Sequence, residues 1–310
     1  MTVITQVRSA ADWRGDQIAH EHRWRLTLSD AQQAEVLGAL GAVQAAGMAP
    51  QDVSRGAFPL SSLGPALDRL AREVTHGPGF ALVRGLPLAD LDERRCELIA
   101  LGIAGYFGRI VAQGPDQVSA LHVRDEGVDP SRPTTRSYQH NQRLGFHADP
   151  TDIVALLCIR PAKSGGLSTI VSSVAVHNEI VRTQPDLARV LYSPWWFDRR
   201  SGNDPDSFFQ QPVYELDAAG RLTSHYGPDY MRSAQRAAHV PPLTPAQDQA
   251  MQAVDQLNHD PRFALAMDLR AGDLQFLNNH VILHARTEYE DHPEPERRRD
   301  LLRLWLDTDE

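Results

Sequence analysis

His147 and Asp149 carry two metal-binding side chains separated by a single residue, and a further histidine, His284, follows far downstream. On an extended segment, residues two positions apart point to the same side of the backbone. A histidine from a remote strand can then complete a set of two histidines and one carboxylate. Such a set occupies one face of an octahedron around non-heme iron(II) and leaves positions open for a bidentate co-substrate and oxygen.

The neighbours of this pair decide between a metal site and an ordinary turn, because His-x-Asp also suits a turn at Asp149-Pro150. The pair leads directly into a long apolar run at residues 153–159. His284 follows another apolar run at 274–277, and a further alternating run continues to residue 306. Candidate ligands next to buried strands are expected where the strands of a barrel end and its cavity opens. We therefore favour a metal site over an ordinary turn.

The alternating run near the end of the chain places two arginines on one face. With a period of two, the residues that share this face are Arg299, Leu301, Arg303 and Trp305. Arginines beside Leu and Trp are unusual on a solvated strand and suit a cavity that receives anions, because a guanidinium binds a carboxylate through two charge-assisted hydrogen bonds. An exposed edge strand is the alternative for residues 297–298.

The elements that must position these residues fall into two parts. The first hundred residues are expected to be mostly helical, with helices at 29–47, 63–74 and 90–107 and a strand at 80–84. Strands then dominate, at 153–159, 169–171, 211–216, 221–226, 274–277 and 301–306, with helical inserts at 174–183 and 244–257. This order predicts a mainly β fold with flanking helices, one structural domain and a jelly-roll core. The helical part also offers surface for a homo-oligomer.

The amino-acid composition limits the kinds of partner that the protein is expected to bind and the cell compartment in which it is expected. The 310 residues are 42% hydrophobic with a net charge of −9, which argues against nucleic acid as the main partner because phosphate binding depends on basic patches. A few buried arginines can still bind a small anionic or zwitterionic metabolite. The two cysteines, Cys96 and Cys158, are expected to be buried thiols of a reducing compartment. With no apolar run that resembles a signal peptide or spans a membrane, the expected location is the cytoplasm.

Four blocks in order resemble the TauD/TfdA family of iron(II)- and 2-oxoglutarate-dependent dioxygenases, which have a double-stranded β-helix fold. The blocks are FHAD at 146–149, SGGLST at 164–169, NNHVILHART at 278–287 and RRDLLR at 298–303. The resemblance extends over residues 78–308 and includes the strand at 79–87. It implies one catalytic domain over 1–310, in which residues 1–77 form a mostly helical extension packed on a jelly-roll core at 78–310.

The resemblance also implies roles for individual residues. Its iron(II) ligands are His147, Asp149 and His284. Arg299 corresponds to the residue that binds the distal carboxylate of 2-oxoglutarate, and Thr169 to the hydroxyl beside it. The spacing after the Gly-Gly pair is one residue longer than usual for Thr169, so Ser168 is a competing assignment. Arg303 corresponds to a residue that faces the primary substrate.

Three functions are compatible with these residues. The leading one is an oxygenase that consumes 2-oxoglutarate and O2, releases succinate and CO2, and abstracts hydrogen from a small carboxylate or amino-acid-like metabolite to hydroxylate it. A zinc hydrolase could use the same triad to activate water. A metabolite-binding barrel without catalysis would retain Arg299 and Arg303 but would not need the three metal ligands. Only the first gives a reason for every block.

Several other residues have both a functional and a structural interpretation. Arg143, a candidate substrate-binding residue, and His140 precede the metal pair and are candidates for the cavity mouth, with a solvated loop as the alternative. His280 is expected to be structural, because a four-residue spacing shares one face only on a helix. The aromatic residues 195–197 and Tyr226 are expected to pack in the core rather than form a substrate wall.

Overall fold

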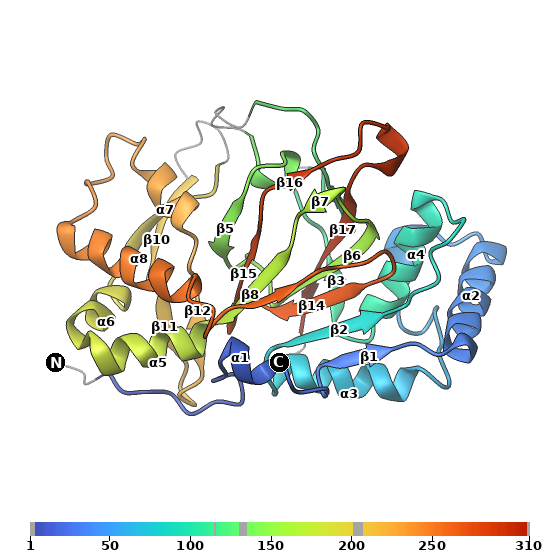
Figure 1. The fold of residues 1–310 in the computed structure, drawn as a ribbon, viewed down its shortest axis with the longest axis horizontal. Coiled ribbons are helices and arrows are strands. Elements are labelled where there is room, and N and C mark those ends of the chain that lie inside the picture. Colours follow the sequence, from blue (N-terminus) through green and yellow to red (C-terminus); the bar gives the residue numbers. More distant parts are fainter. Residues whose placement is uncertain (1–3, 115, 130–134, 201–206, 309–310) are drawn as a thin grey trace.

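Two β-sheets that share one hydrophobic layer form the centre of the protein (Figure 1). The computed structural model describes residues 4–114, 116–129, 135–200 and 207–308. The larger, seven-stranded sheet has the order β1 (Arg25–Thr27), β2 (Phe80–Arg84), β14 (Leu274–Asn278), β6 (Ile153–Arg160), β17 (Asp300–Asp307) and β3 (Arg109–Val111), with β4 (Leu121–Val123) also paired to β17. The four-stranded sheet has the order β13 (Leu265–Met267), β8 (Ser168–Ser172), β15 (Ile282–Arg286) and β5 (Leu144–His147).

Helices and short strand pairs surround the two sheets, together with the short 3-10 helices Pro50–Asp52, Ser137–Gln139 and Pro295–Arg297. The helices are α1 (Gly15–Ile18), α2 (Asp30–Ala45), α3 (Gly64–Thr75), α4 (Glu93–Ala104), α5 (Ser173–Thr183), α6 (Pro185–Leu191), α7 (Pro228–Ala234) and α8 (Pro245–Asn258). The short antiparallel pairs are β9 (Trp195–Asp198) with β10 (Phe208–Gln211), β11 (Tyr214–Leu216) with β12 (Leu222–Ser224), and β7 (Ser164–Gly165) with β16 (Tyr289–Glu290). None of the helices in the described ranges is long and apolar enough to cross a membrane.

The alternation of β6 and β17 sorts their side chains between two layers. Ala155 and Leu157 of β6 and Leu304 of β17 pack with α2, α3 and α4 on the outer face of the large sheet. Val154 of β6 and Leu301 of β17 point the other way, into the layer shared with the small sheet. The predicted period of two in the last strand is therefore confirmed, and it determines which side chains reach the interior.

The small sheet is covered on its outer face by the second group of helices. Val171 of β8 and Leu283 of β15 pack there with apolar residues of α5, α6 and α8. Two sheets with a common interior and helices outside them agree with the predicted mainly β, jelly-roll core.

Local signals account for most element boundaries, with one clear exception. Ser29 caps α2 through a capping box with Gln32, as expected from the sequence at the start of that helix. The single strand predicted at 211–216 is wrong, because the chain forms two separate strands, β10 and β11, on either side of Pro212. Proline has no backbone N–H to donate to a ladder, so it interrupts the strand there.

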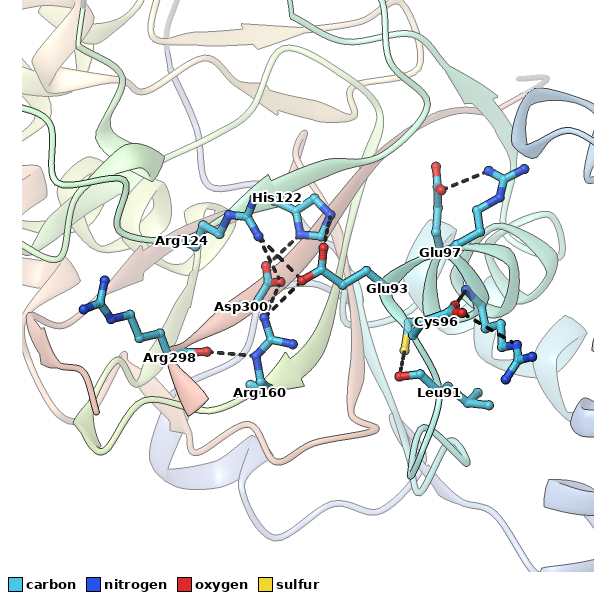
Figure 2. Close-up of polar contacts among 12 residues, drawn as sticks. Leu91, Glu93, Cys96, Glu97, His122, Arg124, Arg160, Arg298 and Asp300 are labelled. Carbon is cyan, nitrogen blue, oxygen red and sulfur yellow. Dashed lines mark hydrogen bonds and ion pairs between the residues drawn. The ribbon is translucent and has the colours of Figure 1, made fainter. Parts of the chain in front are cut away.

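A network of charged side chains joins α4, β4, β6 and β17 (Figure 2), and its member Asp300 directly follows Arg299 in the chain. The carboxylate of Asp300 is completely buried and contacts Nδ1 of His122 at 2.8 Å and Nη2 of Arg160 at 2.9 Å. Arg124 lies 3.7 Å from the same carboxylate, and Glu93 contacts Arg160 at 3.3 Å. Glu93, His122 and Asp300 are close enough together to hold a metal ion. The two arginines already neutralise these carboxylates, so we interpret the group as an ion-pair network.

Replacing Asp300 with alanine is expected to lower the free energy of unfolding by on the order of 3 kcal/mol, because loss of one partner leaves buried charge uncompensated. Denaturant unfolding measures this change. The matched control is Glu290→Ala, which removes an exposed ion pair with Lys163 (2.6 Å) and is expected to cost about 0–1 kcal/mol. Equal losses in the two variants would contradict a special role for the buried carboxylate.

Candidate metal centre

Strand register brings the two candidate histidine ligands together. His284 of β15 is the direct cross-strand partner of His147 of β5, and their rings lie 4.2 Å apart between centroids. Asp149 follows β5 by two residues, so its side chain reaches the same place. One ligand atom from each of the three residues lies within 4.8 Å of the others, and all three residues are buried. The structure thus unites the three residues singled out in the sequence.

The hydrogen bond of His147 and the burial of His284 suit metal ligands. The Gly145 carbonyl lies 2.9 Å from Nδ1 of His147 and accepts its hydrogen bond, which leaves the Nε2 lone pair free. Burial, reinforced by His147, lowers the pKa of His284 to about 3, so that its imidazole is neutral. Nδ1 of His284 is buried and has no hydrogen-bond partner in the described part of the chain. A neutral imidazole at His284 and an Nε2 lone pair left free on His147, beside the Asp149 carboxylate, suit a divalent transition metal.

Asp149 is held by residues of the last strand. Its Oδ2 accepts hydrogen bonds from the indole N–H of Trp305 at 3.0 Å and from Nη1 of Arg303 at 3.4 Å. Its Oδ1 lies 3.7 Å from Nε2 of His147. Burial alone would raise the pKa of Asp149, but Arg303, the two histidines and Trp305 together lower it to about 2. The carboxylate is therefore ionised, with one oxygen already bonded and the other turned toward the histidines.

Replacing Trp305 with phenylalanine is expected to weaken iron(II) binding by about 10–100-fold, the usual cost of losing a hydrogen bond that orients a metal ligand. Competition with a chromophoric chelator measures this affinity. The matched control is Trp13→Phe, because the Trp13 indole donates to the Pro78 carbonyl away from the site. Iron affinity equal to that of the unaltered protein would show that Trp305 does not orient the carboxylate.

Asn279 positions the backbone of Asp149 and was missed in the sequence. Its Oδ1 accepts a hydrogen bond from the Asp149 backbone N–H at 3.0 Å, and its Nδ2 donates to the Thr151 carbonyl at 3.0 Å. Asn279 is buried in the turn between β14 and β15. The signal that could have found it was its place in the Asn278-Asn279 pair shortly before His284.

A small cavity of about 50 Å³ extends from the three candidate ligands toward a group of polar side chains. Its polar lining includes Ser168, Arg286 and Arg299. Thr169 is not among the lining residues, since neighbouring residues of a strand face opposite sides. The geometry therefore favours Ser168, the competing assignment, over Thr169. As it stands, the Ser168 hydroxyl lies 2.9 Å from Oε1 of Gln275 and donates to it.

Arg299 lines this cavity and is only 5% exposed. Its backbone N–H donates to Asp291 at 2.7 Å, and its Nη1 donates to the Val123 carbonyl at 3.2 Å. Its guanidinium also lies over the ring of Tyr289, 4.9 Å from the centroid. Burial lowers the pKa of Arg299 from its usual value. In the described residues its guanidinium forms no ion pair, so it can receive an anion.

A larger cavity of about 540 Å³ meets the small one at the metal centre, because both are lined by His147, Asp149 and Arg303. Arg303 donates from Nε to Gln113 at 2.9 Å, in addition to its contact with Asp149. Further out, the wall contains the arginines and aromatic side chains Arg136, Arg199, Phe197, Phe209 and Tyr230. The wall of the larger cavity thus combines arginines and aromatic side chains with the carboxylates Asp198 and Asp229.

The structure does not support the substrate-binding role predicted for Arg143. Arg143 is exposed and is absent from the described lining of both cavities. Arg136 lines the larger cavity, where Arg143 had been expected. It donates to the backbone carbonyls of Arg199 and Arg200, both at 3.2 Å. The loop before β5 turns Arg143 toward solvent, which its position near the metal pair did not reveal.

The remaining predicted residues divide between the core and the cavity. Nε2 of His280 contacts Asp152 at 2.9 Å, away from the candidate ligands, as expected for a structural residue. Trp195 and Tyr226 are buried in the layer under α5, α6 and α8. Phe197 lies in that layer and also lines the larger cavity.

Comparisons with known proteins agree with this geometry. Residues 44–305 match the family described as "Taurine catabolism dioxygenase TauD, TfdA family". FR-33289 synthase of Streptomyces rubellomurinus is 28% identical over 305 residues, covering 96% of this chain and 89% of that protein. Taurine hydroxylase-like protein SAT17 of Stachybotrys chartarum is 32% identical over 312 residues, covering 96% and 79%. The structure of an asparagine oxygenase with Fe(II), 3-hydroxyasparagine and succinate superposes with a TM-score of 0.73 at 18% identity, covering 92% and 94%.

Proposed function

Because the chain belongs to the TauD/TfdA family, we propose that His147, Asp149 and His284 hold the iron(II) of a 2-oxoglutarate-dependent dioxygenase. The observation that carries this assignment is the convergence of three buried ligand atoms within 4.8 Å. Iron(II), 2-oxoglutarate and O2 supply the oxidising chemistry of the family, in which 2-oxoglutarate becomes succinate and CO2 and a substrate C–H bond is oxidised. The protein's own residues position the participants and exclude water.

Each part of the site has a task in this proposal. Trp305 and Arg303 hold one oxygen of Asp149, so the other oxygen is available to the metal. The Gly145 carbonyl holds His147 in the tautomer that offers Nε2. Arg299, which lines the small cavity with Ser168, binds the distal carboxylate of 2-oxoglutarate, and the Ser168 hydroxyl turns toward the same carboxylate.

The substrate we propose is a small carboxylate or amino-acid-like metabolite, which is hydroxylated. The larger cavity has the volume of a small-molecule site and opens directly onto the candidate ligands. Arg303 and Arg136 offer positive charge to an anionic group, and Phe197, Phe209 and Tyr230 offer apolar surface. The asparagine oxygenase complex contains a hydroxylated amino acid, which supports this substrate class.

Two other functions are less favoured. A zinc hydrolase would use the three ligands but gives no task to Arg299, which is buried without an ion-pair partner in the described ranges. A non-catalytic binding barrel does not need an ionised and oriented carboxylate beside two buried histidines. Family membership favours the oxygenase over both.

Anaerobic titration of the metal-free protein with iron(II) and then 2-oxoglutarate tests the assignment. A weak visible absorption band, typical of an iron(II) chelate with a 2-oxo acid, is expected to develop in proportion to protein. Succinate formation under air, with amino acids and small carboxylates as candidates, would then identify the substrate. Iron binding without the band would contradict the site as assigned and return the zinc hydrolase to consideration.

A further inference from the structure

Arg286 is a second buried arginine of the small cavity, and its hydrogen bonds are incomplete. It lies on β15, two residues after His284, and is only 6% exposed. Its Nη2 donates to the backbone carbonyls of His140, at 2.8 Å, and Gln142. Its Nε and Nη1 are buried and have no hydrogen-bond partner among the described residues. Buried guanidinium groups usually satisfy their donors, so these free groups indicate a missing acceptor.

Arg286 and Arg299 face the same space. Both line the small cavity, and each guanidinium carbon lies 4.9 Å from the centroid of the Tyr289 ring. Across the described ranges neither guanidinium forms an ion pair with a carboxylate, although the structure contains many such pairs elsewhere. Burial of two unpaired cations side by side is costly unless an anion joins them. Consistently, burial and then Arg299 lower the pKa of Arg286 to about 10.

We propose that Arg286 is a second anion-binding residue of the co-substrate pocket, where its free N–H groups bind the distal carboxylate of 2-oxoglutarate alongside Arg299. The proposal rests on the co-substrate role proposed for Arg299. The Nη2 bonds to the loop before β5 hold the guanidinium in place, so its remaining donors are oriented before the anion arrives. The pocket would then select 2-oxo acids by their second carboxylate.

The test compares two 2-oxo acids on the iron(II)-loaded protein without oxygen. 2-Oxoglutarate and 2-oxobutyrate share the chelating group, but only the first has a distal carboxylate. In Arg286→Gln, the dissociation constant for 2-oxoglutarate is expected to rise roughly tenfold or more, as for loss of one charge-assisted hydrogen bond. The dissociation constants for 2-oxobutyrate and for iron(II) alone are expected to stay unchanged in this variant. Arg298→Gln, which alters an exposed arginine nearby, is the matched control.

Equal weakening of both 2-oxo acids, or no weakening of either, would overturn the proposal and leave Arg286 as a support of the loop. If Arg286→Gln does not fold, Arg286→Lys decides, because lysine can still donate to the loop carbonyls but lacks the other donors. Its preference for 2-oxoglutarate over 2-oxobutyrate is expected to fall, and an unchanged preference would overturn the proposal. If the unaltered protein does not form the absorption band, the site assignment is contradicted together with this inference. If the unaltered protein forms the band and Arg286→Gln binds 2-oxoglutarate with unchanged affinity, only this inference is contradicted.

Discussion

Replacing Asp149 with alanine is expected to abolish both iron(II) retention and turnover. The carboxylate is the only anionic member of the proposed ligand set, and the positive charge of Arg303 keeps it ionised. Loss of a group that merely orients a ligand costs about 10–100-fold in metal affinity, so loss of the ligand itself should exceed that. Iron content after gel filtration and succinate formation measure the two effects. The same result is expected for His147→Ala.

Two comparisons separate this effect from a loss of folding. Asp149→Asn keeps an acceptor for the Trp305 indole and nearly the same volume, but lacks the negative charge, so it too should lose iron. Asp152→Asn alters a carboxylate close in sequence that instead contacts His280 and Thr308, and it should retain iron. Normal iron content and activity in Asp149→Ala would show that the metal is held elsewhere.

Replacing Arg299 with alanine is expected to raise the 2-oxoglutarate requirement sharply while iron(II) still binds. A charge-assisted hydrogen bond lost from a buried site costs about 1.5–3 kcal/mol, which corresponds to roughly 10- to 150-fold in affinity. Arg299 is buried and forms no ion pair in the described chain, so no neighbouring carboxylate competes for it. The apparent 2-oxoglutarate constant, followed by succinate formation, measures the change.

Arg303→Ala decides between the two arginines of the last strand. Arg303 contacts Asp149 and lines both cavities, whereas Arg299 lines only the small one. Loss of the Arg303 side chain should therefore weaken binding of the primary substrate and of iron(II), and leave binding of 2-oxoglutarate unchanged. If Arg303→Ala alone raises the 2-oxoglutarate requirement, the roles of the two arginines are exchanged. Arg298→Ala, which alters an exposed side chain, should leave unchanged both the affinity for iron(II) and the apparent constant for 2-oxoglutarate.

Periodic and local patterns predicted much of this protein. The alternation from Leu301 to Trp305 placed these side chains on the inner face because successive side chains of a strand point to opposite sides. The Ser29 capping signal lies directly before the helix α2 that it starts, and the apolar run at 153–159 coincides with the strand β6 that it predicts. The three candidate ligands were found because their residue types are chemically distinctive, even though His284 is remote from the others.

Only the tertiary structure decided which neighbouring side chain faces the cavity and which groups orient the ligands. Ser168 rather than Thr169 reaches the small cavity because pairing of β8 with β13 and β15 fixes the face of each residue. Arg143 was expected near the substrate but is exposed, whereas Arg286 lines the small cavity. Arg143 lies in a loop that turns outward, whereas Arg286 is carried inward by the register of β15. A one-residue shift in register reverses every side chain of a strand, and that register depends on strands far away in the chain.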